Sequence, residues 1–206
     1  MAEQDTPQIY LISPPQIELS RFSETLASIL DARDIACFRL ALASEDEDDI
    51  SRTADLMRET CHARDVAIVI EQHFRLVDRL GLDGVHLPDG PRQVRDVRAE
   101  LGSDAIIGSH CGTLRHNGMS AGEAGADYVC FGPVGASALG DGSVAEPDMF
   151  QWWSEMIEVP VVAEGGLTPE LVTTLAPVTD FFAVGAEIWT DDDPLASLKT
   201  LLAPLG

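Results

Sequence analysis

The chain has 206 residues, 45% of them hydrophobic and 23% charged, which predicts one folded domain over residues 1–206. Acidic residues outnumber basic ones by 35 to 13, and a net charge of −22 excludes a basic clamp for nucleic acid and disfavours anionic membranes. We attribute the acidity to a solvated surface. Lysine occurs once, at Lys199, which excludes Schiff-base aldolases and Walker A phosphate loops.

The four cysteines, at positions 37, 61, 111 and 130, form no C-x-x-C pair, so neither a disulfide framework nor a zinc knuckle is expected. The N-terminus has no basic region followed by a long apolar run, and no apolar run reaches 18 residues. The sequence therefore predicts a protein of the reduced cytoplasm.

Short β-rich runs alternate with helical patterns along the whole chain. The runs cover residues 8–12, 35–40, 66–70, 83–87, 105–108, 127–131, 159–163 and 180–184. Helical patterns cover residues 18–32, a segment opening with the acidic cluster 45–49, a stretch ending at Leu80, the region around 150–153, and residues 194–202. Continuous apolar strands are typical of parallel sheets. Eight such units predict an α/β fold, a (β/α)8 TIM barrel, with a doubly wound sheet as the alternative.

Glycine turns follow the last two predicted strands. Glu164 is followed by Gly165 and Gly166, and Val184 is followed by Gly185. In barrels these loops commonly bind phosphate, because glycine lets backbone N–H groups approach an anion. Tight turns with positive φ are the structural alternative. We expect Gly165, Gly166, Val184 and Gly185 to bind a phosphate group of a small phosphorylated metabolite.

An arginine and two histidines stand near the ends of other predicted strands. Arg39 lies inside an apolar run, so it needs either a structural carboxylate or a ligand phosphate as its partner. His86 is interpreted as bracing the barrel rim through hydrogen bonds. His110 follows the fifth strand and is placed to act as an acid, base or donor. A zinc site with Cys111 and His116 is disfavoured because no fourth ligand follows.

The chain resembles the thiamine phosphate synthases over nearly its whole length. The resemblance is carried by the runs 10–12, 38–39, 83–87, 106–108, 125–129, 131–133, 160–163 and 165–168. It implies a (β/α)8 barrel that joins a pyrimidine-methyl diphosphate to a thiazole phosphate. In that reaction diphosphate leaves with Mg²⁺, and the thiazole nitrogen captures the pyrimidine cation. Arg39 then matches the diphosphate-binding arginine, and the four turn residues match positions around the thiazole phosphate.

Several positions depart from the family pattern. Its lysine two places after the arginine is Ala41, and its Asn-Asp pair reads Glu71-Gln72. The second Mg²⁺ carboxylate is absent or displaced to Asp89, which leaves Glu71 and Asp89 as the candidate metal ligands. A Ser or Thr becomes His110, and the phosphate loop keeps one hydroxyl, on Ser137.

Three functions from different classes follow from these substitutions. The first is a thiamine phosphate synthase with a remodelled metal site, whose activity is altered or lost. The second is a thiazole tautomerase-like isomerase that uses His110, although the tautomerase histidine aligns nearer Gly112. The third is a non-catalytic binder of a phosphorylated thiamine precursor. The oligomeric state is left open.

Overall fold

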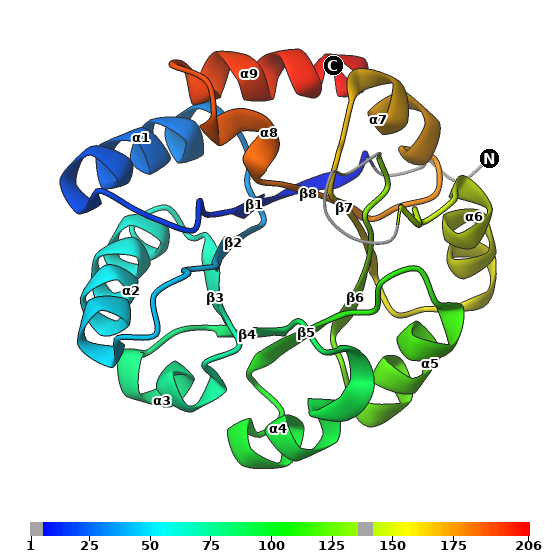
Figure 1. Ribbon diagram of the computed structural model, residues 1–206, viewed down its shortest axis with the longest axis horizontal. Coiled ribbons are helices and arrows are strands. Elements are labelled where there is room, and N and C mark those ends of the chain that lie inside the picture. Colours follow the sequence, from blue (N-terminus) through cyan, green and yellow to red (C-terminus); the bar gives the residue numbers. More distant parts are fainter. Residues whose placement is uncertain (1–5, 136–141) are drawn as a thin grey trace.

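The computed structural model describes residues 6–135 and 142–206, and its strands form one closed parallel barrel in the order β1 to β8 (Figure 1). The predicted (β/α)8 barrel is therefore confirmed, and the doubly wound sheet is excluded. The sheet closes where β8 pairs with β1, with Tyr10 opposite Ala183. The strands are β1 (Gln8–Ile12), β2 (Cys37–Leu40), β3 (Ala67–Glu71), β4 (Gly84–Leu87), β5 (Ile106–His110), β6 (Tyr128–Phe131), β7 (Val161–Glu164) and β8 (Phe181–Val184).

Helices surround the barrel, and Figure 1 shows them as a ring outside the strands. The α-helices are α1 (Leu19–Ala32), α2 (Glu47–His62), α3 (Val77–Leu80), α4 (Val94–Leu101), α5 (Arg115–Ala124), α6 (Pro147–Met156), α7 (Pro169–Leu175), α8 (Ala186–Trp189) and α9 (Pro194–Leu201). Short 3-10 turns η1 (Phe74–Leu76), η2 (Gly90–Arg92) and η3 (Ala203–Leu205) complete the pattern. Among the described residues, no helix is long and apolar enough to cross a membrane.

Alternate residues of each strand face the lumen or the helices. A large apolar core lies between strands and helices, and a smaller one fills the lumen around Tyr10, Val69 and Tyr128. The ring of Tyr128 fits inside because its neighbour on β5 is Gly108, where an added Cβ would lie 2.0 Å from the ring. A glycine at this position therefore makes room for an aromatic side chain in the barrel interior.

Three aspartates repeat one structural role at the amino ends of the strands. The carboxylates of Asp83, Asp127 and Asp180 accept the backbone N–H of Ile68, Ile107 and Val161 at 2.7, 2.7 and 2.8 Å. Each aspartate precedes an even-numbered strand and satisfies a donor of the strand before it. Part of the acidity is thus structural, because these carboxylates pin neighbouring strands at the barrel end opposite the strand C-termini.

Several predicted strand boundaries were wrong by one or two residues; the second strand, for example, begins at Cys37 rather than residue 35. The seventh strand begins at Val161 rather than residue 159, since Pro160 has no N–H to donate to a sheet. The fifth strand runs on to His110, so this histidine is its last residue rather than part of the loop. The acidic start of α2 is confirmed: Asp46 caps the helix, accepting from Asp48 and Asp49 N–H at 3.0 Å.

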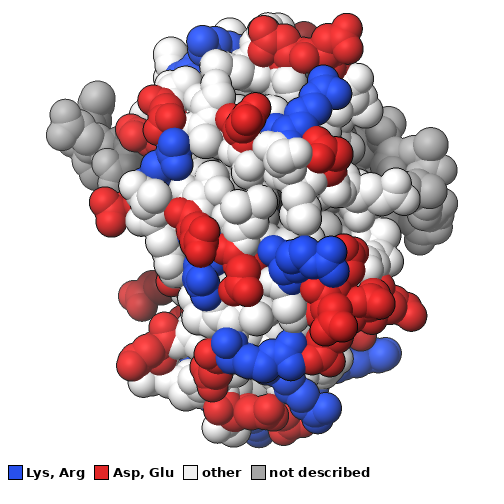
Figure 2. All heavy atoms as spheres, turned by 90° about the vertical axis from the view of Figure 1, so that its left-hand side faces the viewer, with Lys and Arg blue, Asp and Glu red and all other residues white. Residues whose placement is uncertain are grey.

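The surface over α1 and α2 carries charges of both signs. Figure 2 shows Asp and Glu side chains spread over this face with Lys and Arg side chains beside them. Around these helices Arg64 pairs with Asp31 at 2.7 Å, and Arg79 pairs with Glu47. No basic patch gathers on this face.

Candidate active site

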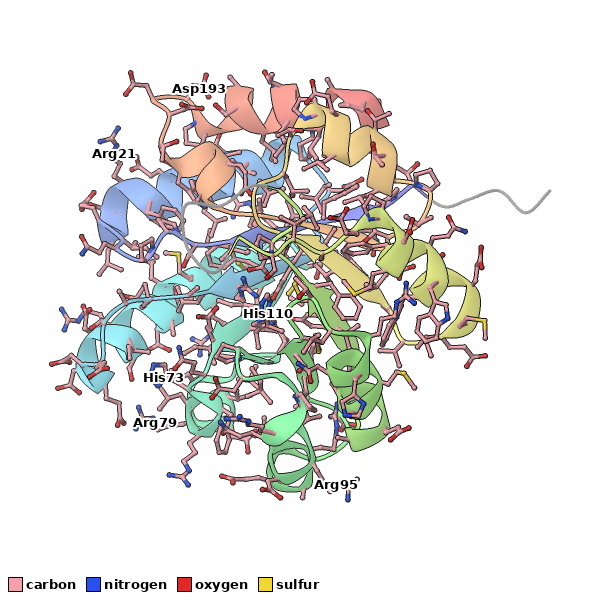
Figure 3. The ribbon with its side chains drawn as sticks, turned by 45° about the vertical axis from the view of Figure 1, so that its right-hand side comes forward. Arg21, His73, Arg79, Arg95, His110 and Asp193 are labelled. Carbon is pink, nitrogen blue, oxygen red and sulfur yellow. The ribbon has the colours of Figure 1, made fainter. Side chains whose placement is uncertain are left out.

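The carboxyl ends of the strands carry a layer of polar side chains above the apolar lumen. This layer consists of Arg39 on β2, Glu71 on β3, His86 on β4, His110 on β5 and Glu164 on β7. Figure 3 shows His110 near the centre of the ring of strands, whereas the labelled His73 lies farther out. Polar groups gathered at this end of a parallel barrel mark the place where such folds build their sites.

Arg39 is almost fully buried, at 3% exposure, and is held by two carboxylates. Its Nη2 donates to Glu164 Oε1 at 2.6 Å, and its Nε lies 3.5 Å from Glu71 Oε2. Among the described residues, Nη1 and Nε have no hydrogen-bond partner. The structure thus supplies the carboxylate that the sequence analysis required, and it leaves two donors for a further acceptor.

The Arg39–Glu164 pair is ionised on both sides. Burial disfavours both charges, but the charge and hydrogen bond of Arg39 outweigh it at Glu164 and lower the pKa of that carboxyl to about 2. Burial likewise works against the guanidinium charge, but Glu164 and the Tyr10 hydroxyl raise the pKa of Arg39 above its ordinary value. Cys130 also donates to Glu164 Oε2 at 2.9 Å. Glu164 is therefore a fixed anion with both oxygens engaged.

His86 belongs to a buried hydrogen-bonded chain. Its Nδ1 lies 3.0 Å from the Tyr128 hydroxyl, which lies 2.7 Å from the Tyr10 hydroxyl. Burial, and then the charge of Arg39, hold the pKa of His86 well below its ordinary value, so the ring is neutral. The bracing role predicted for His86 agrees with these contacts, because the histidine ties β4 to β6 inside the barrel.

His110 lies close enough to two other groups to form a potential three-ligand cluster. Nitrogens of His86 and His110 and a carboxylate oxygen of Glu164 all lie within 4.8 Å of one another. His116 is instead exposed on α5, as expected. Cys111 is buried and contacts Ser109, so these positions do not assemble the disfavoured zinc site in the described structure.

The two glycine turns converge on a carboxylate of the chain itself. Glu187 on α8 accepts from Gly166 N–H at 2.9 Å and Leu167 N–H at 3.2 Å through Oε1. Its Oε2 accepts from Gly185 N–H at 2.9 Å. We call these three N–H groups the anion cup. Backbone donors from the loops after β7 and β8 thus meet around one anion.

Glycine is required at the first of these turns for backbone reasons too. Gly165 and Gly166 have φ of +86° and +71°. A Cβ on Gly166 would lie 3.0 Å from the backbone of Gly135, and one on Gly135 would lie 1.9 Å from the Gly166 oxygen. The tight-turn interpretation therefore holds, and replacing Gly166 would disturb the loop as well as any ligand.

One cavity of about 540 Å³ connects these features. Among its lining residues are Arg39, Glu164, Gly165, Gly166, Gly185 and Glu187. The Arg39 side chain and the two glycines of the anion cup therefore line the same space, which is large enough for a small organic phosphate.

Comparison with known proteins identifies the family to which the chain belongs. The family model for thiamine monophosphate synthase matches residues 9–188. The chain belongs to the thiamine monophosphate synthase family. It is 41% identical to a thiamine-phosphate synthase from Rhodospirillum centenum over 88% of this chain and 89% of that one. It is 38% identical to one from Erythrobacter litoralis, with 95% of each chain covered. The resemblance stated from the sequence is confirmed.

A solved structure has the same architecture as this protein. The thiamine phosphate pyrophosphorylase from Pyrococcus furiosus superposes with a TM-score of 0.82 over 96% of this chain and 95% of that one. Its sequence identity is 18%, so this likeness establishes the barrel fold.

Glu71 and Asp89, the candidate Mg²⁺ ligands of this protein, fit the ion poorly. Glu71 is paired with Arg39, and Asp89 lies exposed before the turn η2. Neither belongs to the three-ligand cluster, which offers two imidazoles and one carboxylate that is already engaged. Mg²⁺ prefers an oxygen set with several waters, so neither group of residues makes a ready Mg²⁺ site.

The remaining predicted residues lie in different settings. Val184 is fully buried and ends β8, so only its backbone faces the turn that leads to Gly185. Ser137 lies outside the described residues. Arg39, His110 and the glycine turns are brought to one end of the barrel, which leaves their roles as proposals.

Sequence reasoning missed three residues that shape this site. Glu164 was treated only as the end of a strand, although a carboxylate closing an apolar run signals a buried partner. Tyr128 belonged to the family match, and its contact with His86 was not foreseen. Glu187 carried no signal, since a glutamate two residues after a glycine turn is ordinary.

Proposed function

We propose that the protein joins a pyrimidine-methyl diphosphate to a thiazole phosphate as a slow, divergent thiamine phosphate synthase. The observation that carries the proposal is the buried Arg39 guanidinium, whose Nη1 and Nε lack hydrogen-bond partners among the described residues. The Arg39 side chain lines the same cavity as Gly166 and Gly185 of the anion cup. A buried guanidinium with free donors suits the oxygens of a phosphate or diphosphate.

The proposed roles follow from the two ends of this cavity. Arg39 would donate to oxygens of the leaving diphosphate, while the anion cup would hold the thiazole phosphate. The C–O bond to diphosphate breaks with its electron pair on oxygen, and the thiazole nitrogen then forms the new C–N bond to the methylene carbon. The protein's contribution is to orient the two substrates and to stabilise charge on the departing group.

The balance of charges at the carboxyl ends of the strands supports a slow reaction. Glu71 and Glu164 offset the single positive charge of Arg39, and the family's lysine position is Ala41. A diphosphate would meet one cation between two carboxylates. Losing one preorganised electrostatic contact costs on the order of 10²–10³ in rate, so the combined losses should lower turnover strongly.

A product assay tests the proposal. Purified protein is incubated with the pyrimidine diphosphate and the thiazole phosphate, and thiamine phosphate is followed by chromatography. We expect product at a low rate that Arg39→Gln lowers at least tenfold, whereas Arg33→Gln, which removes a cation outside this layer, leaves the rate unchanged. No product above the protein-free control would refute the synthase proposal.

An isomerase is the second candidate, favoured by the position of His110 beside His86 and Glu164 at the barrel mouth. A histidine there can move a proton on a thiazole phosphate without diphosphate chemistry. Metal-free isomerisation of a thiazole phosphate tautomer, abolished in His110→Ala and retained in His116→Ala, would favour this function. Binding of thiazole phosphate without either turnover would instead indicate a non-catalytic binder.

A further inference from the structure

Glu187 occupies the positions that a bound anion would take. Its two carboxylate oxygens accept all three N–H groups of the anion cup, at 2.9, 3.2 and 2.9 Å. A carboxylate offers two acceptor oxygens in a plane, and a phosphate offers three around a tetrahedron, so both suit converging donors. The side chain is therefore an internal substitute for the phosphate.

The carboxylate and a phosphate cannot use the cup together. Each N–H donates to one good acceptor, and two anions brought into contact in a partly enclosed cavity repel each other. Glu187 is half-buried in α8, and the two residues before it, Gly185 and Ala186, are small. An incoming phosphate must therefore displace this side chain, and the N–H bonds that Glu187 loses reduce the net affinity.

We propose that Glu187 is a specificity-determining residue that keeps free inorganic anions out of the cup. Inorganic phosphate gains only the three N–H bonds, which Glu187 already makes without losing translational freedom. A phosphate ester gains the contacts of its ring with the rest of the 540 Å³ cavity as well. Only a ligand of the second kind has enough binding energy to displace the carboxylate.

This inference rests on the proposed function, since it assigns the thiazole phosphate to the same cup. The competition between Glu187 and phosphate does not depend on turnover, however, and the two can be tested separately. A protein that makes no thiamine phosphate but shows the predicted competition would refute only the synthase proposal. A protein that makes product without the competition would refute only the present one.

The test is calorimetric titration with inorganic phosphate. Glu187→Gln removes the charge and keeps an amide oxygen, and Glu187→Ala empties the cup. We expect both variants to bind phosphate at least tenfold more tightly than the unmodified protein. Glu170→Gln, which removes an exposed carboxylate from the first turn of α7, is the matched control and should change the affinity less than twofold.

Thermal unfolding with and without phosphate separates competition from a structural role. If Glu187 mainly ties the two loops together, Glu187→Ala will melt at a lower temperature and bind phosphate no better than the unmodified protein. Unchanged or weaker phosphate binding in the folded Gln variant overturns the proposal, as does an equal gain in Glu170→Gln. Tighter phosphate binding in the Glu187 variants but not in Glu170→Gln supports the proposal. Tighter binding in Glu187→Gln alone is also sufficient support.

Discussion

Arg39 Nη2 and Glu164 Oε1 lie 2.6 Å apart although the two residues are 125 positions apart in the sequence. Arg39 lies in β2 and Glu164 is the last residue of β7, so the ion pair links two strands across the carboxyl end of the barrel. A buried pair of this kind costs desolvation on both sides, and removing either partner leaves an uncompensated charge. The pair therefore couples the stability of the barrel to the electrostatics of the site.

Glu164→Gln should lower the free energy of unfolding by about 3–5 kcal/mol, because Arg39 would be left buried beside Glu71 alone. The double variant Arg39→Met/Glu164→Met should recover most of that loss, since it removes both charges. Urea denaturation measures both values. The exposed pair Arg64–Asp31 is the control, and breaking it should cost far less, because water screens it. Equal losses at the two pairs would contradict the prediction.

The neutral His86 predicts a stability that falls with acidification. Its folded pKa lies well below its ordinary value of 6.5, so the unfolded chain binds the proton first and protonation favours unfolding. His86 thus penalises the folded state as the pH falls below 6.5, by up to about 1.4 kcal/mol per pH unit.

Comparing the protein with His86→Asn between pH 7 and pH 5 isolates this effect. Asparagine can still bond to Tyr128 but does not titrate, so its unfolding free energy should fall less steeply. The groups facing His86, namely Arg39, Glu164 and His110, are the same in both proteins. Parallel pH profiles would show that His86 does not carry the dependence.

Magnesium should bind weakly. We expect no calorimetric signal for Mg²⁺ at millimolar concentration in the protein alone, and only a modest Mg²⁺-dependent gain in diphosphate affinity. The reason is that Glu71 already pairs with Arg39 and Asp89 sits on the exposed rim. A large gain that is lost in both Glu71→Ala and Asp89→Ala would show that these residues rebuild the metal site.

Asp180 should support the fold without affecting the site. Asp180→Ala removes the acceptor of the Val161 N–H and should cost about 1–3 kcal/mol in urea denaturation. Asp180→Asn keeps an oxygen acceptor and should cost less. Both variants should bind phosphate like the unmodified protein, since this carboxylate lies at the amino end of the strands. A change in binding would mean that the two ends of the barrel are coupled.

The barrel was predictable because its signals are local and repeated. Eight apolar runs with helical segments between them leave few alternatives, and the errors were boundary shifts of one or two residues, for example where Pro160 delays a strand and His110 prolongs one. The glycine turns were found for the same reason, since positive φ at Gly165 and Gly166 favours glycine in any context.

The internal partners of the site were not predictable because they are set by closure of the sheet. Arg39 clearly needed a partner, but a carboxylate 125 positions away becomes its neighbour only in three dimensions. Glu187 is harder still, because it reaches back to donors in both its own loop and the preceding one. A resemblance to other sequences names positions around a ligand, whereas it is silent on a side chain that takes the ligand's place.

The pairing of β1 with β8 also sets the order in which the molecule can be completed during synthesis. Tyr10 finds Ala183, and Leu11 finds Val184, only after that last strand has left the ribosome. Until then β1 lacks one of its two sheet neighbours, and Arg39 lacks its Glu164 partner until β7 is in place. An open sheet edge invites pairing with other chains, so closure by β7 and β8 both protects the barrel and completes the charge balance at the carboxyl ends of its strands.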